Sequence, residues 1–135
     1  MAKKRWVYSP RKQTASKVPD NLKRMVKTKA DELVETVLIP KYVKTPPEDY
    51  QFNYLVNIYT QWYRQYFYFC STYHVPGPNA IAPSFEDKFA RLEYVAGGRF
   101  NLAYMRHTGQ WQEITQSISL DKALEMIRDS GIFQP

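Results

Sequence analysis

The sequence predicts an α+β fold, an antiparallel meander sheet of about five strands with two helices, preceded by an extended basic N-terminal arm. Segments near both ends of the domain repeat their apolar residues at helical spacing. Between them lie segments rich in aromatic and β-branched residues, separated by turn formers. Residues 1–18 are polar and basic and show no periodicity. We therefore expect an arm over residues 1–18 and a single domain over residues 19–135.

The first expected helix spans residues 20–39. Pro19 suits its first turn, and Asp20 lies where the helix dipole favours an acid. Pro40 is expected to end it, because proline cannot donate the next backbone hydrogen bond. Apolar residues three and four apart form one stripe for the core.

Residues 52–73 contain ten aromatic side chains in 22 positions, and their type of structure is ambiguous. Their apolar residues have helical spacing, yet Tyr, Phe, Trp, Val, Ile and Thr are strand formers. We predict two strands, at 53–61 and 65–73, with a turn near Tyr63 and Arg64.

Three further strands are expected, over 89–95, 99–106 and 111–114. Gly97 and Gly98 form the first turn between them, and residues 107–109 the second. Alternation predicts one core face along these strands, made of Ala90, Leu92, Tyr94, Phe100, Leu102 and Tyr104. A last helix over 120–130 is expected, with Ser119 as its cap and Gly131 at its end.

The C-terminal half resembles a small uncharacterised bacterial family that is known only as a domain of unknown function. The resemblance lies mainly over residues 87–134 and is looser over the first helix and hairpin. It implies this fold and a bacterial origin, and it brings no catalytic or ligand-binding residues. The positions that carry it are Arg91, Tyr94, Tyr104, Arg106, Gly109, Trp111 and Asp121.

The net positive charge of the chain is confined to residues 1–29. They hold ten Lys and Arg and a single acid, whereas the other residues hold nine Lys and Arg and twelve Asp and Glu. Nucleic acid, either DNA or RNA, is the expected partner, because each Lys or Arg near a phosphate releases condensed counterions. The expected nucleic-acid-binding residues are Lys3, Lys4, Arg5, Trp6, Tyr8, Arg11, Lys12, Lys17, Lys23, Arg24 and Lys27.

A second surface for nucleic acid is expected on the aromatic hairpin. If Phe67 and Phe69 point inward, the tyrosines between them point outward. Rings and guanidinium groups on a sheet can stack single-stranded bases. The alternative is that the second helix covers this face and the tyrosines belong to the core. The possible stacking residues are Tyr59, Arg64, Tyr66 and Tyr68.

The arm also contains a short apolar segment, Trp6-Val7-Tyr8, which a purely solubilising tail would not need. Its rings could stack on bases. Alternatively, the segment docks on another protein, and the chain is an interaction subunit of a larger assembly.

No sequence pattern identifies an enzyme, so we favour a non-enzymatic accessory protein with no catalytic residue, metal or cofactor. The lone Cys70 lies among rings that would raise its pKa, and at strand spacing it would lie about 13 Å from His74. The remaining enzymatic alternative is a metal-dependent phosphodiesterase. Its carboxylates would be Glu86, Asp87, Glu93 and Glu113.

Composition favours a cytoplasmic protein that does not interact with membranes. The hydrophobic fraction of 44% is sufficient for a core, and the aromatic fraction of 16% indicates that large rings build it. A single cysteine cannot form an internal disulfide and fits a reducing compartment. No apolar run approaches the ~20 residues of a membrane span.

Overall fold

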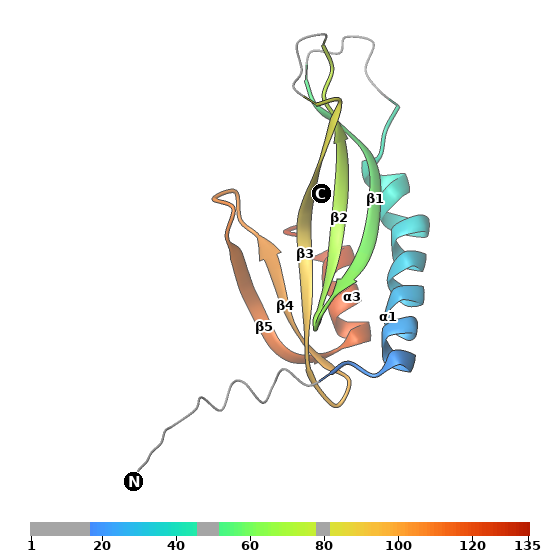
Figure 1. The fold of residues 1–135 in the computed structure, drawn as a ribbon, viewed down its shortest axis with the longest axis vertical. Helices are drawn as coiled ribbons and strands as arrows, with labels where there is room; N and C mark the ends of the chain where they lie inside the picture. The colour runs from blue at the N-terminus through green and yellow to red at the C-terminus, as the bar shows by residue number, and fades with distance from the viewer. Residues whose placement is uncertain (1–16, 46–51, 78–81) are drawn as a thin grey trace.

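The computed structural model describes residues 17–45, 52–77 and 82–135, which form one five-stranded antiparallel sheet and a set of helices (Figure 1). The strands follow one another in the order β1-β2-β3-β4-β5, so β1 and β5 are the edges. This meander with two main helices confirms the predicted α+β fold. The elements are α1 (Asp20–Leu33), η2 (Val34–Leu38), α2 (Ile39–Tyr42), β1 (Tyr54–Tyr63), β2 (Tyr66–His74), β3 (Ser84–Ala96), β4 (Arg99–Met105), β5 (Trp111–Ser119) and α3 (Leu120–Asp129).

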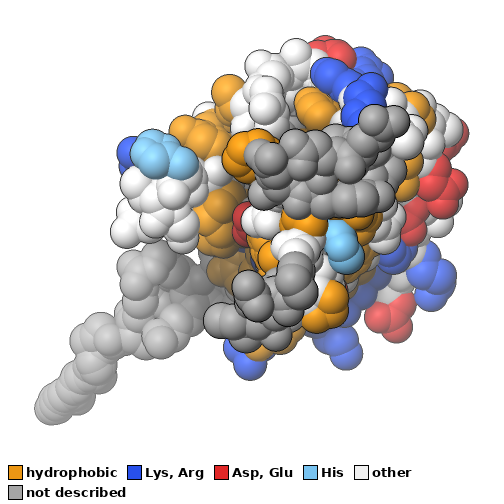
Figure 2. Space-filling view, turned by 90° about the horizontal axis from the view of Figure 1, so that it is seen from above, with side chains coloured by type: hydrophobic (Ala, Val, Ile, Leu, Met, Phe, Trp, Pro, Cys, Tyr) orange, Lys and Arg blue, Asp and Glu red, His pale blue; other side chains and the backbone are white. Residues whose placement is uncertain are grey.

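Both α1 and α3 pack on the same face of the sheet (Figure 1). Their apolar stripes share one core with inward side chains of β2, β3 and β4, including Phe67, Leu92 and Phe100, each of which is fully buried. Burial of such large side chains is the main stabilising contribution to the fold. On the outer side of the helices, acidic and basic side chains gather at the right of Figure 2. The opposite face of the sheet, called here the open face, is covered by no described helix or strand.

Alternation along the strands explains why the two faces differ. Phe67 and Phe69 of β2 are fully buried in the core, and Tyr66 and Tyr68 between them are only partly buried on the open face. The predicted hairpin of residues 52–73 is therefore confirmed. Its turn places Arg64 in the left-handed region, at φ 57°. A non-glycine residue at such a φ is uncommon.

The predicted end of the first helix at Pro40 is wrong, because the helical course continues to Tyr42. One π-type turn precedes the proline, and the N–H of Ile39 donates to the carbonyl of Val34, five residues back. The wider turn changes the hydrogen-bond pattern just before the ring of Pro40, which would collide with the carbonyl of Thr36 in a regular α-helix.

Two strands are longer than predicted. β3 begins at Ser84, five residues before the expected start, and β5 continues to Ser119, beyond the expected end at Ile114. The added residues have polar sequences with weak strand propensity, and pairing with neighbours keeps them extended: Ser84 lies opposite His74, and Ser119 opposite Arg99. In contrast, the Gly97-Gly98 turn, the Ser119 cap and the core face of β3 and β4 confirm the predictions.

Candidate functional site

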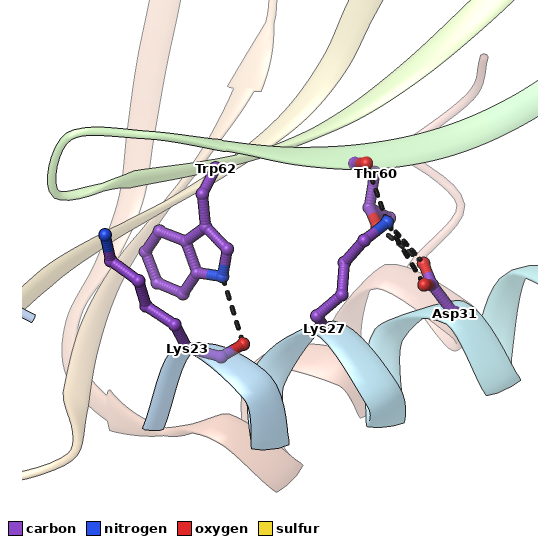
Figure 3. Close-up of polar contacts among 5 residues, drawn as sticks. All are labelled: Lys23, Lys27, Asp31, Thr60 and Trp62. Carbon is purple, nitrogen blue, oxygen red and sulfur yellow. Dashed lines mark hydrogen bonds and ion pairs between the residues drawn. The ribbon is translucent and has the colours of Figure 1, made fainter. Parts of the chain in front are cut away.

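Four cations at one end of the domain form no ion pair within the described residues. Lys17 precedes α1, Lys23 and Arg24 lie in its first turns, and Arg64 lies in the β1–β2 turn. Trp62 joins these elements: its indole N–H donates to the carbonyl of Lys23 at 3.2 Å, and the Lys23 ammonium lies 6.0 Å from its ring centroid (Figure 3). The guanidinium of Arg64 lies 5.2 Å from the ring centroid of Tyr63. We call these four cations the basic end.

The structure gives Lys27 internal partners, unlike the other cations expected to hold phosphates. Its ammonium donates to the Thr60 carbonyl at 2.9 Å and the Thr60 hydroxyl at 2.8 Å, and it forms an ion pair with Asp31 at 3.1 Å (Figure 3). The Thr60 hydroxyl in turn donates to Asp31 at 2.5 Å. This network joins α1 to the edge strand β1. The expected role of Lys27 in holding phosphate is therefore not retained in our proposal.

Lys27→Met is expected to lower the free energy of unfolding by about 1–2 kcal/mol. Methionine keeps the length and apolar volume of the side chain but leaves the buried Thr60 without its donor. This loss in the free energy of unfolding is at the lower end of the range for hydrogen bonds to a charged group. The Lys27 and Asp31 side chains are 44% and 37% exposed, so solvent screens the pair. Urea unfolding of the variant and the wild type measures the difference.

Lys44→Met provides the control, because Lys44 is exposed and lies outside this network. Equal stability of Lys27→Met and wild type would show that the network contributes nothing to the joining of α1 and β1.

The predicted stacking residues lie on the open face or at its edge. Tyr59 faces Cys70 across β1 and β2, and its hydroxyl donates to Glu86. This bond, more than burial, raises the pKa of Tyr59. Tyr66 and Tyr68 lie on the same face, with ring centroids 6.1 Å apart, and burial raises the pKa of Tyr68. The second helix does not cover these residues, since α3 packs beside α1 on the other face.

Three residues that the sequence reasoning did not assign to the site complete this surface. The Arg91 guanidinium lies 5.0 Å from the ring centroids of both Tyr66 and Trp111. Tyr68 lies 5.9 Å from Trp111, and the Lys88 ammonium lies 5.5 Å from Tyr68. We call these five residues the ring–cation row, which runs across β2, β3 and β5. The row comprises Tyr66, Tyr68, Lys88, Arg91 and Trp111.

Two local features bring the row together. Lys88 and Arg91 are three apart, a spacing that places side chains on opposite faces of a regular strand. A β-bulge brings the two side chains to the same face. Phe69 of β2 pairs with Ala90 of β3, but the next residue, Cys70, pairs with Lys88, so Phe89 is the extra residue of the bulge. On β4 the residue opposite Arg91 is Ala103, whose small side chain leaves room for the ring of Trp111.

No described group of three or more His, Cys, Asp or Glu side chains could hold a metal ion. This applies to Glu86, Asp87, Glu93 and Glu113, so the geometry gives the phosphodiesterase alternative no support. Cys70 is buried, and burial is the main cause that raises the pKa of its thiol. A raised pKa lowers the thiolate fraction and hence the reactivity of the thiol.

The other residues that we predicted to bind nucleic acid through the arm lie outside the described residues. They are Lys3, Lys4, Arg5, Trp6, Tyr8, Arg11 and Lys12.

No described helix is long and apolar enough to cross a membrane.

Fold and site together define a small α+β protein whose meander sheet has one face covered by helices and one open face with aromatic and cationic side chains. The chain belongs to the family described as Domain of unknown function (DUF3024), whose model matches residues 15–135. The resemblance expected from the C-terminal half is thus confirmed, and the match extends over the first helix and hairpin as well. No curated protein and no solved structure matches the chain.

Proposed function

We propose that this protein is a non-enzymatic accessory protein that binds nucleic acid through its basic N-terminal arm and its basic end. The observation that carries the proposal is the difference between two sets of cations. Lys27 and Lys29 have carboxylate partners at 3.1 Å, whereas the four cations of the basic end have none among the described residues. Cations that form no ion pair remain available for phosphates.

The position of the basic end supports the same proposal. Lys17 directly follows residues 1–16, which hold five further Lys and Arg and no acid. These charges continue along the chain into Lys17, Lys23 and Arg24, so one strand of nucleic acid could contact both the arm and the basic end. The rings of Trp62 and Tyr63 lie among the cations, and Tyr63 is 55% exposed. Exposed rings beside cations suit contacts with bases as well as phosphates.

The proposal is tested with the full chain and a fluorescent oligonucleotide, by anisotropy at several salt concentrations. We expect log Kd to rise linearly with log salt concentration. An arm-neutralised variant, with Lys3, Lys4, Arg5, Arg11 and Lys12 replaced by Gln, should reduce this slope by up to about 3.5, or about 0.7 per lost contact to a single strand.

Binding that ignores salt, or that the arm-neutralised variant retains unchanged, would contradict the proposal. If the chain binds no nucleic acid and instead copurifies, after nuclease treatment, with a protein in fixed stoichiometry, the alternative role as an interaction subunit replaces it. In that case the segment Trp6-Val7-Tyr8 is the first candidate for the docking contact.

A further inference from the structure

The ring–cation row has the surface of a binding platform rather than that of a core. Its three rings are only partly buried, although no described element packs over them (Figure 1). Tyr66 and Tyr68 are inclined by 29°, and Tyr68 and Trp111 by 35°, with centroids about 6 Å apart in both pairs. The rings of β2 and β5 therefore form a connected aromatic surface on the open face.

The cations of the row have no carboxylate partner among the described residues. Neither Lys88 nor Arg91 forms an ion pair there, and the Nε of Arg91 is buried without a hydrogen-bond partner. Buried donors in native proteins are nearly always satisfied, so an unsatisfied guanidinium donor needs an explanation. The rings of Tyr66 and Trp111, each with its centroid 5.0 Å from the guanidinium, provide cation–π contacts in place of an acceptor, and the charge of Arg91 is matched by no carboxylate within the described residues.

The acids on this side of the sheet do not neutralise the row. Glu86 accepts a hydrogen bond from Tyr59, and Glu113 accepts one from Gln116 at 2.6 Å. Glu93 lies opposite Tyr66 in the strand register and forms no ion pair within the described chain. None of these carboxylates forms an ion pair with Arg91 or Lys88, so both cations remain available for direct contact with an external group.

We infer that the open face binds unpaired bases, so that the nucleic acid of the proposed function is single-stranded. The inference rests on that function and deepens it by naming the substrate class. Bases stack on Tyr66, Tyr68 and Trp111, and Arg91 and Lys88 contact the phosphates between them. An open sheet can use rings in this way only when the bases are unpaired, because a duplex buries the faces of its bases. Three rings suit two or three bases, as in other sheet-based readers.

The test compares oligo-dT of about 12 nucleotides, a length within the site sizes of single-strand binders, with a duplex of the same length. The wild-type chain should bind the single strand more tightly. Tyr68→Leu and Trp111→Leu should each weaken binding of the single strand about 5- to 100-fold, while binding of the duplex stays unchanged. Phe85→Leu is the matched control, because Phe85 is an exposed ring of β3 outside the row. This control variant should bind the single strand as tightly as the wild type does.

Failure of this inference is distinguishable from failure of the proposed function. Equal binding of single strand and duplex, with ring variants that bind as the wild type does, would overturn the platform and leave the salt-dependent function intact. Binding of neither probe would overturn both. Weaker binding of a poly-glutamate peptide by the ring variants, without an effect on oligo-dT, would assign the row to an acidic protein instead.

A second measurement uses only the wild-type chain, so its result does not depend on whether the variants fold. Oligo-dU containing 4-thiouracil is photocrosslinked to the wild-type chain, and the crosslinked peptides are identified by mass spectrometry. Crosslinks in β2 at Tyr66 or Tyr68, or in β5 at Trp111, support the platform. Crosslinks confined to the arm and the first turns of α1 would overturn it.

Discussion

Phe67→Ala is expected to lower the free energy of unfolding by about 3–5 kcal/mol, the largest stability change that we predict for this chain. Phe67 is fully buried near the start of β2, between Trp62 on β1 and Leu92 on β3. Its ring lies 5.0 Å from that of Trp62 and 5.7 Å from that of Phe69. Alanine would remove these contacts and leave a cavity that the rigid sheet cannot close.

Urea denaturation followed by circular dichroism measures this effect, with Phe52→Ala as the control. Phe52 is 77% exposed and precedes β1, so its loss should change the free energy of unfolding by no more than about 0.5 kcal/mol. A similarly small value for Phe67→Ala would mean that Phe67 does not belong to the core that the helices share with β2, β3 and β4.

Alternation of side chains was sufficient to predict most of the sheet. The inward Phe67 and Phe69 and the outward Tyr66 and Tyr68 follow from period two alone, and so does the core face of β3 and β4. The turns at Gly97-Gly98 and the Ser119 cap have strong local chemistry, because glycine adopts positive φ freely and serine accepts from the first free N–H groups.

Features that depend on a distant partner could not be predicted. The first half of β3 contains Glu86, Asp87 and Lys88, poor strand formers that extend only because β2 pairs with them. Pro40 is a helix breaker by its own chemistry, yet one π turn accommodates it. In β3, tertiary pairing outweighs local propensity, whereas at Pro40 the helix itself changes its hydrogen-bond pattern.

The candidate site was predictable in its tyrosines but not in its cations. Arg91 reaches Tyr66 and Trp111 because a bulge at Phe89 sets the register and Ala103 leaves space on β4. Neither feature has a sequence signal that a single chain reveals. The internal partners of Lys27 were equally hidden, since Thr60 is 33 residues away and joins it only through the fold.

Neutralising three of the four cations of the basic end is expected to cause the largest loss of binding to single-stranded nucleic acid that we predict for the domain. The variant is Lys23→Gln, Arg24→Gln and Arg64→Gly in the full chain. Three lost phosphate contacts predict a loss of about 100-fold at about 0.1 M salt and a reduction of the salt slope by about 2. Fluorescence anisotropy with oligo-dT measures both quantities.

This variant also separates binding from folding. Arg64 has φ 57°, which glycine adopts without strain, so Arg64→Gly should not destabilise the turn. The matched control removes three cations that already have carboxylate partners, through Lys29→Gln, Lys122→Gln and Arg128→Gln. Both variants lose the same net charge, but only the first loses cations without partners. If both weaken binding equally, the long-range field of the protein attracts the nucleic acid and the basic end makes no direct contact. If only the first does, the location of the charge determines binding, as expected when unpaired cations touch phosphates.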